Sequence, residues 1–323
     1  MKSKLFALPT VFSFKSLLFI FCLLTWSCDS DDNTTTIIPG NTVLHVIRTE
    51  ASTSTFSDAV NRTATGTILN NQNTRFTVFA PNNEAFAAYL QANGYGSLDQ
   101  VPAAALENLV NYHIGLGSYV AERLDSARLI STLGEAKIFI YNSNNSISLN
   151  GEAQVIQPDL SGRNGVVHIL DGVLTPPTQT LGQYISSRAT AENPEFNLLQ
   201  AAIERAGLTT LLNSNSQPYT LLAPTNAAFT AAGYASPEDI ANEDPAVLQN
   251  ILSYHLLPAY RFSFAFRNQE VVTRQGNRVQ VDATNKTVKG IGNTEAAALI
   301  AAEQDVLAIN GIVHAINQVL LPE

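Results

Sequence analysis

Cysteine, methionine and tryptophan are nearly absent from this chain. Its 323 residues include two cysteines, one methionine and one tryptophan, and all four lie within the first 28 residues. The remainder of the chain therefore has no disulfide and no thiolate ligand for a structural zinc site. It also has no tryptophan that could form a flat platform for stacking a sugar ring.

Charged residues are few as well, and the acidic ones predominate. They make up 14% of the chain, with 27 acidic residues against 18 basic ones, which gives a net charge of −9. No basic stripe offsets this excess, and a negative surface repels the phosphates of nucleic acid. We therefore expect no nucleic-acid partner. The 45% hydrophobic content is typical of a globular chain.

The N-terminus combines positive charge with a short apolar segment. Three lysines precede or open the run SLLFIFCLLTW at 16–26, which is too short to span a bilayer and suits the core of a signal peptide. Ser27-Cys28 follows, and the segment resembles the lipobox of bacterial lipoproteins. We predict a signal peptide at 1–27, lipidation of Cys28 and a flexible tether at 28–40; cleavage at another position is the alternative.

The predicted anchor also indicates a location. The tether begins DSDDN, and acidic residues directly after the lipidated cysteine resemble the surface-export signal of Bacteroidetes lipoproteins. We therefore expect an outer-membrane lipoprotein that faces the outside of the cell. Removal of residues 1–27 takes away three lysines and no acid, so the net charge becomes 15 − 27 = −12.

Three sequence blocks occur twice in the same order, which indicates a tandem repeat. FTVFAPNNEAF, NLVNYHI and NGVVHILDGVLTPP begin at residues 76, 108 and 164; YTLLAPTNAAF, NILSYHL and NGIVHAINQVLLPE begin at residues 219, 250 and 310. The spacing predicts one domain at 41–177 and a second at 179–323. Pro176-Pro177 forms a stiff junction between them.

Each copy has helical patterns in its first half and strand patterns in its second, which favours an α+β fold. In the first copy we expect helices at 42–50, 56–64, 84–92 and 101–113, and strands at 75–80, 136–142, 146–152, 153–159 and 165–174. Pro81 would end the first strand, and Asn82 or Asn83 would cap the helix after it. Asn150-Gly151 is typical of a tight hairpin turn.

The repeated blocks resemble the signature of the fasciclin (FAS1) domain. The resemblance rests on T-V-F-A-P-x-N-x-A-F, on the Tyr-His pair about 26 residues later and on the closing N-G-x-x-H-x-I-x-x-V-L, and the two copies cover nearly the whole chain after the tether. It implies two tandem domains, each a twisted β-wedge or sandwich decorated by helices. It also implies a role in adhesion or extracellular ligand binding.

Four of the five histidines lie in the repeated blocks, at His113, His168, His255 and His314. A metal or catalytic role is one interpretation, but two histidines per domain without further ligands do not complete a zinc site. The interpretation we favour is that each imidazole satisfies buried backbone groups in the core. We expect His45, which has no counterpart in the second copy, on a helix surface.

The resemblance also carries over possible adhesion-motif positions. Tyr-His and Asp-aliphatic segments have been proposed as integrin-binding motifs in animal fasciclin-type proteins. The matching residues are Tyr112, His113, Asp159, Leu160, Tyr254, His255, Asp305 and Val306. The alternative is that these residues shape the fold, since an aspartate before a strand is often a turn-former.

We find no catalytic motif, and we expect no enzyme, cofactor or metal. G-x-S-x-G, H-E-x-x-H, Walker and EF-hand patterns are all missing. Asp125-Ser126-Ala127 resembles a Bacteroidetes O-glycosylation sequon, which makes Ser126 a candidate modification site.

The predicted function is adhesion or extracellular ligand binding by two similar domains on one tether, with an extracellular protein or glycan as the partner. Two weak sites on one chain gain avidity when both engage. Two alternatives stay open. One is an accessory glycan-binding lipoprotein of a polysaccharide-uptake system, and the other is an unrecognised hydrolase that uses one of the paired histidines.

Overall fold

The corner that the sequence repeats joins the central strand of each domain to a helix. In the computed structural model, which describes residues 41–124, 128–134, 136–143 and 146–323, β1 (Phe76–Pro81) leads into α4 (Asn83–Ala92). The side chain of Asn82 caps α4, because its Oδ1 accepts from the Ala85 N–H at 2.7 Å. The predicted cap is therefore confirmed.

The second copy builds the same corner with a different cap. Here β8 (Tyr219–Pro224) leads into α9 (Asn226–Ala231), and the Oγ1 of Thr225 accepts from the Ala228 N–H at 3.3 Å. The Asn226 side chain instead connects the corner to an earlier helix, the one that contains Leu198. Its Oδ1 accepts from the Leu198 N–H at 3.1 Å. Threonine replaces asparagine without loss because both offer an oxygen at the N-cap.

The first domain places five helices before or between its strands. The helices are α1 (Val43–Thr49), α2 (Ser54–Asn61), α3 (Thr65–Leu69), α4 and α5 (Ala103–Tyr112), and the further strands are β2 (Ile114–Leu116), β3 (Arg128–Ser131), β4 (Lys137–Ser143), β5 (Ser146–Leu149), β6 (Ala153–Gly162) and β7 (Gly165–Leu170). The strands form one sheet in the order β2-β1-β7-β6-β5-β4-β3. A single bridge between Gly115 and Thr132 brings β2 back to the end of β3, so the sheet curls around on itself.

The second domain has the same central strands, but its strands divide into two sheets. Its helices are α6 (Leu181–Ala189), α7 (Asn197–Arg205), α8 (Thr209–Leu212), α9, α10 (Pro237–Asn242) and α11 (Pro245–Tyr254), and its further strands are β9 (Leu256–Pro258), β10 (Gln269–Val272), β11 (Arg278–Asp282), β12 (Thr287–Lys289), β13 (Ala297–Ala298), β14 (Val306–Ala308) and β15 (Gly311–Ile316). They form two sheets, β14-β15-β8-β9 and β10-β11-β12-β13. The predicted α+β class with two tandem domains is confirmed.

The centre of each domain is a parallel pair made from the first and last long strands. β1 pairs with β7 from Phe76↔Gly165 to Pro81↔Leu170, and β8 pairs with β15 in the same way. A Cβ added to Gly165 or Gly311 would lie 1.9 Å from the carbonyl oxygen of the partner strand's first residue. Glycine is therefore required where these two strands meet.

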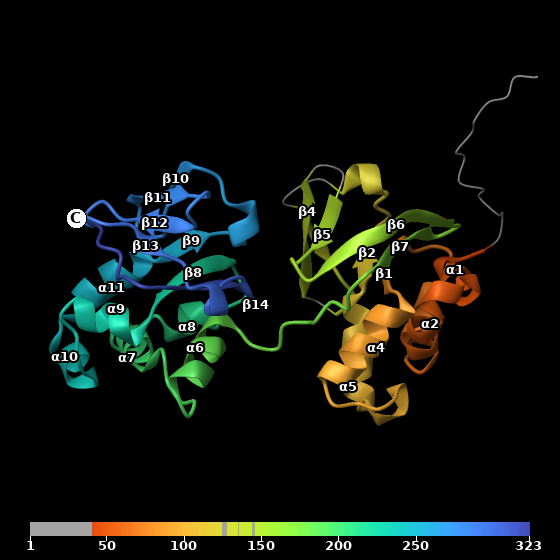
Figure 1. Cartoon of the computed structure of the whole chain (residues 1–323), viewed down its shortest axis with the longest axis horizontal. Coiled ribbons are helices and arrows are strands. Elements are labelled where there is room, and N and C mark those ends of the chain that lie inside the picture. Colours follow the sequence, from red (N-terminus) through yellow and green to blue (C-terminus); the bar gives the residue numbers. More distant parts are fainter. Residues whose placement is uncertain (1–40, 125–127, 135, 144–145) are drawn as a thin grey trace, which may run out of the picture. The chain divides into compact units, whose positions relative to one another are not determined.

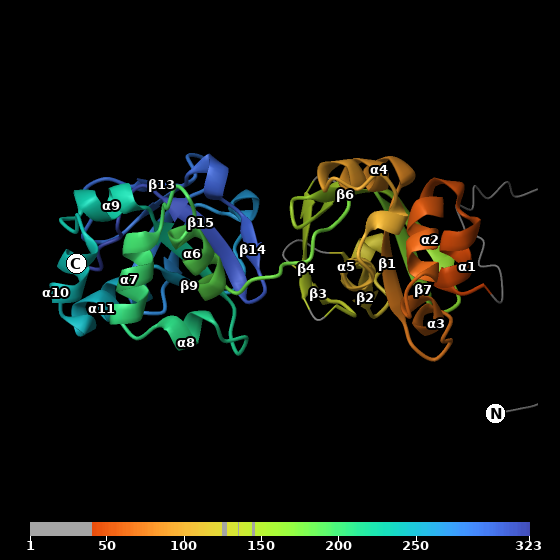
Figure 2. The same cartoon turned by 90° about the horizontal axis from the view of Figure 1, so that it is seen from below.

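The central strands are buried on both faces, so each domain has two core clusters. Along β1, Phe76, Val78 and Ala80 contact the helices, whereas Phe79 contacts the hairpin strands, as the alternation of side chains in a strand requires. Burying each large apolar side chain contributes about 1.5–3 kcal/mol. Figure 1 shows that the helices of each domain gather on one side of its strands, and Figure 2 shows each domain after a quarter turn.

The predicted hairpin turn is also present. Asn150 and Gly151 have φ angles of 54° and 74°, and the Glu152 N–H donates to the Leu149 carbonyl at 2.9 Å. Two successive positive φ angles are the requirement of a type I′ turn, which asparagine followed by glycine meets with the least strain. In the part of the chain that the structure describes, no helix has the length and apolarity needed to cross a membrane.

Candidate binding surface

Three polar side chains, two of them buried and one partly exposed, hold the loop that follows the short edge strand of each domain. The loops are residues 117–121, after β2, and residues 259–263, after β9. The side chains are a threonine on the first central strand, a histidine on the last central strand, and an aspartate beside that histidine. We call these three residues the loop clasp; they are Thr77, Asp159 and His168 in the first domain and Thr220, Asp305 and His314 in the second.

In the first domain the clasp binds the loop at four backbone groups. The Thr77 hydroxyl donates to the Gly117 carbonyl and accepts from the Tyr119 N–H, both at 2.9 Å. His168 Nε2 lies 2.9 Å from the Tyr119 carbonyl. The Asp159 carboxylate accepts from the Ala121 N–H at 2.8 Å. The backbone from 117 to 121 is thereby fixed in one conformation.

The second domain reproduces each of these contacts. Thr220 donates to the Ala259 carbonyl at 2.8 Å and accepts from the Arg261 N–H at 2.9 Å. His314 Nε2 lies 2.7 Å from the Arg261 carbonyl. The carboxylate of Asp305 accepts from the backbone N–H and from the hydroxyl of Ser263, both at 2.5 Å. The clasp is therefore a property of the repeated fold.

The clasp histidines are neutral core residues. The Nδ1 of His168 accepts from the Asp159 N–H at 3.2 Å, and the Nδ1 of His314 accepts from the Asp305 N–H at 3.0 Å. Nε2 must then carry the proton that reaches the loop carbonyl. Burial lowers the pKa of both imidazoles below its usual value. The favoured interpretation, that these histidines satisfy buried backbone groups, is confirmed.

The clasp aspartates occupy a backbone conformation that few residues adopt. Asp159 and Asp305 have φ angles of 63° and 60°, and Asp159 lies where β6 shifts its register against β7. Aspartate tolerates this left-handed region because its short side chain can bond locally. This turn-forming role explains why both domains have an aspartate at this position. The neighbouring Leu160 and Val306 are half-buried.

The Tyr-His pairs lie in the core and not on the surface. Tyr112, His113, Tyr254 and His255 are all fully buried, so no partner touches them in the folded domain. The expectation that they lie at an adhesive surface is thus corrected. Each tyrosine is the last residue of a helix and each histidine is its C-cap, at the end where the helix leads into a buried strand.

The buried pairs instead connect the helix to the end of the domain. His113 Nδ1 lies 2.8 Å from the Leu109 carbonyl, and its Nε2 accepts from the Leu174 N–H at 3.0 Å. His255 bonds to the Ile251 carbonyl and the Leu320 N–H in the same way, both at 2.9 Å. Complete burial lowers the pKa of each imidazole to about 4.

The side chains that the clasped loops display differ between the domains. The first loop has Val120, which is 38% exposed, next to Leu116 on β2, which is 40% exposed. Tyr119 is half-buried, with the guanidinium of Arg128 5.3 Å from its ring centroid. The structurally equivalent residue in the second loop is Arg261. The loop backbone is repeated, and its side-chain chemistry is not.

A further pair of residues that sequence reasoning missed connects the last central strand of each domain to its helices. Asn164 accepts from the Val43 N–H and donates to the Leu69 and Asn71 carbonyls, each at 2.8 Å. Asn310 makes the equivalent bonds in the second domain. The clasp threonines were missed as well. Both residue types recur at matching positions of the repeated blocks, which is the signal that could have identified them.

Some predicted sites fall outside the described residues, namely Cys28 and Ser126. Among the residues that are described, no group of three or more histidine, cysteine, aspartate or glutamate side chains is arranged to hold a metal ion. His45 is exposed on α1, as expected.

Comparison with known proteins identifies the family. The family model described as Fasciclin domain matches residues 51–176 and 194–322. The chain belongs to the fasciclin family. Fasciclin domains occur in cell adhesion proteins.

Individual relatives are similar over most of this chain. Transforming growth factor-beta-induced protein ig-h3 of Sus scrofa is 31% identical over 253 residues, which cover 77% of this chain and 35% of that protein. Periostin of Homo sapiens is 28% identical over 252 residues, with coverage of 77% and 28%. This chain thus spans about a third of the length of these relatives.

A solved structure of a fasciclin domain pair from the insect cell adhesion molecule fasciclin I is also similar. The match has a TM-score of 0.38 at 19% sequence identity, and it covers 82% of this chain and 95% of the other.

Proposed function

We propose that this fasciclin protein is a non-catalytic binding module of the cell surface that holds an extracellular ligand through its two clasped loops. The observation that supports this is the repeated clasp. In each domain a buried threonine, a buried histidine and a partly exposed aspartate fix a short loop next to exposed apolar or charged residues. A loop that is already ordered loses less conformational entropy on binding.

The two loops contribute different contacts to the ligand. The first presents aliphatic side chains and a tyrosine, whereas the second presents an arginine in the equivalent position. Binding at one loop raises the effective concentration of the ligand at the other loop, provided that one ligand or surface engages both. Two loops of different chemistry suit adhesion to a surface that offers a group for each of them, and they suit turnover of a small substrate less well.

The location follows from the predicted leader. We infer that Cys28 carries a lipid that anchors the chain to the outer membrane, with both domains outside the cell. Mass spectrometry of the N-terminal peptide tests the lipid, with Cys28→Ser as the matched variant. Protease treatment of intact cells tests surface exposure. A leader cleaved elsewhere with an unmodified cysteine would contradict the anchor.

A binding screen tests the proposed function. The purified protein would be applied to arrays of glycans and of extracellular proteins, and an array ligand would then be titrated against variants. Leu116→Ser with Val120→Ser alters the first loop surface. Ile68→Ser is the matched control, because Ile68 on α3 is exposed to the same degree, 41%.

The loop surface and the control should behave differently. We expect the double variant to bind roughly tenfold more weakly, because two aliphatic contacts are lost, and Ile68→Ser to bind as the parent does. Equal affinity of all three proteins for every array ligand would exclude the first loop as a binding surface. Mass spectrometry of the peptide that contains Ser126 tests the predicted glycosylation in the same preparation.

A second candidate function is that of an accessory glycan-binding lipoprotein beside an uptake system. It is favoured by one feature of the second domain, a pocket whose polar groups include two arginines. Array ligands confined to glycans would support this candidate over protein adhesion.

A further inference from the structure

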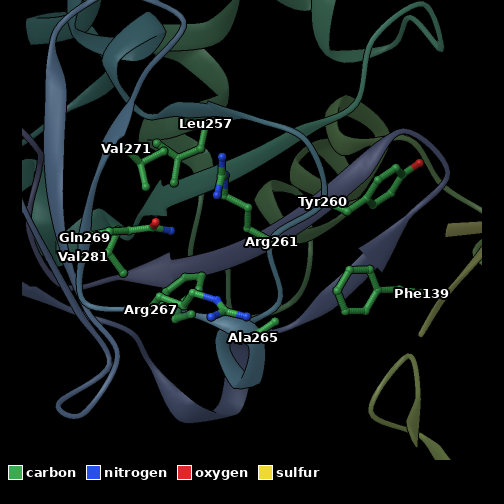
Figure 3. A pocket seen from close by; sticks show the side chains of 10 residues that line it. Phe139, Leu257, Tyr260, Arg261, Ala265, Arg267, Gln269, Val271 and Val281 are labelled. Atoms are coloured by element: carbon green, nitrogen blue, oxygen red, sulfur yellow. The ribbon is translucent and has the colours of Figure 1, made fainter. Parts of the chain in front are cut away.

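A pocket of the second domain lies beside its clasped loop (Figure 3). The apolar part of its lining includes Leu257 on β9, Val271 on β10 and Val281 on β11, all of which are buried. The polar part consists of Arg261, Arg267 and Gln269, and Figure 3 shows both guanidinium groups among the lining side chains. The pocket therefore combines an apolar floor with two cations and one amide.

The two arginines have no ion-pair partner among the described residues. The Nε of Arg261 donates to the Pro258 carbonyl at 3.0 Å, and neither guanidinium lies within ion-pair distance of a described carboxylate. Asp305, on the same loop clasp, is already bonded to Ser263. Two unpaired cations beside one pocket, in a chain with nine more acids than bases, indicate a place for an external anion.

The backbone clasp positions the first of these cations. Thr220 binds the Arg261 N–H, and His314 binds its carbonyl, so the side chain starts from a fixed point. The half-buried guanidinium is partly removed from water, and burial lowers its pKa, although an arginine keeps its charge at any physiological pH. A partly desolvated guanidinium binds an oxyanion more strongly than a fully hydrated one.

We propose that this pocket binds the oxyanion of an acidic saccharide, a carboxylate or a sulfate carried on a sugar ring. A guanidinium matches the two oxygens of such a group with parallel hydrogen bonds. The apolar floor suits the C–H face of the ring, and the Gln269 amide can bond a hydroxyl. The proposal rests on the proposed extracellular binding function and names its ligand class for the second domain.

Arg261 has no counterpart in the loop of the first domain. In the first domain the residue whose carbonyl accepts from the clasp histidine is Tyr119 instead of Arg261. A phenol cannot supply the paired donors that a guanidinium gives to an oxyanion. The two domains therefore share the loop but differ in the kind of ligand that the loop can bind.

Calorimetric titration of the purified full chain tests the site. The probes are galacturonic acid and its tetramer for the carboxylate, galactose 6-sulfate for the sulfate, and galactose as the neutral control. Arg261→Met and Arg267→Met remove the cations while keeping apolar volume. Arg163→Met is the matched control, because it removes an exposed arginine of the first domain and leaves the pocket unchanged.

We expect at least one acidic probe to bind and galactose not to bind. Each pocket variant should weaken that binding roughly 10- to 100-fold, and Arg163→Met should leave it unchanged. The melting temperatures of all three variants should match the parent, because the clasp uses only the backbone of Arg261. Which acidic probe binds decides between carboxylate and sulfate.

Three results would overturn the proposal: binding of neutral galactose with equal affinity, acidic binding that survives both pocket variants, and no binding of any acidic probe. None of these bears on the first loop, whose part in the proposed function would still be shown by array ligands that depend on Leu116 and Val120. Conversely, a silent array beside saturable galacturonate binding would refute the adhesive role and leave the pocket in place.

Discussion

Acidification should destabilise the second domain through His255. This histidine is fully buried between the Ile251 carbonyl and the Leu320 N–H, and burial lowers its pKa from 6.5 to about 4. Between these two pKa values the unfolded chain binds a proton that the folded domain does not. The stability from this group is complete above the unfolded pKa and is lost as the pH falls from 6.5 towards 4.

The expected magnitude follows from the two pKa values. Between about pH 7.5 and about pH 5, one histidine with this shift costs about 2 kcal/mol, and the full loss below both pKa values is about 3 kcal/mol. His314 adds a loss of the same sign, because burial lowers its pKa as well. In contrast, Asp239 and Asp282 have pKa values below 3.8, so they titrate outside this interval.

Urea unfolding at the two pH values measures the effect, with pulsed hydrogen exchange used to follow peptides of the second domain. His255→Gln removes the titrating group, so the fall in stability between the two pH values should shrink by about 2 kcal/mol. His45→Gln, at an exposed position, should leave the fall unchanged. A parent protein equally stable at both pH values would refute the reasoning.

Four further substitutions test the backbone conformation and one buried amide. Ala259 has a φ of 77° where the first domain has Gly117, so Ala259→Gly should raise stability by up to about 1 kcal/mol and Gly117→Ala should lower it, as thermal unfolding would show. Asn310→Ala removes three buried hydrogen bonds and should cost roughly 3 kcal/mol in urea unfolding; a loss below about 1 kcal/mol would contradict this. Gly311→Ala should prevent the second domain from folding, because its Cβ would lie 1.9 Å from a carbonyl oxygen; native-like circular dichroism would show otherwise.

The parts of the fold that could be predicted from the sequence are those with local causes. The turn at Asn150-Gly151 depends on two adjacent residues that accept positive φ angles. The cap at Asn82 bonds only three residues ahead. The repeat itself required no structural knowledge, because three blocks recur in order.

The parts that could not be predicted depend on contacts distant in sequence. Asn164 binds the Val43 N–H, 121 residues away, and no local pattern indicates this partner. The parallel pairing of β1 with β7 joins opposite ends of the domain. The strands β2 and β3 are three and four residues long, too short for a periodicity to indicate.

The residues of the candidate site could likewise be predicted only in part. The clasp histidines were visible in the repeated blocks, and the clasp aspartates stand five residues before the last of these blocks in each copy. A structural role was the favoured interpretation of the imidazoles. The burial of Tyr112 and Tyr254 was not visible, because a tyrosine at the end of a helix can face either the core or solvent. Arg261 and Arg267 were missed because they lie in no repeated block.

The central claim is that the clasped loops are the binding elements, and Thr77→Val with Thr220→Val tests it most directly. These isosteric changes remove the hydroxyls that bind the loop backbones and leave every exposed side chain in place. Affinity for an array ligand would be measured before and after the change, at a temperature where both proteins are folded. We predict roughly tenfold weaker binding, because the loops lose their fixed conformation. Unchanged affinity of the folded double variant would contradict the account.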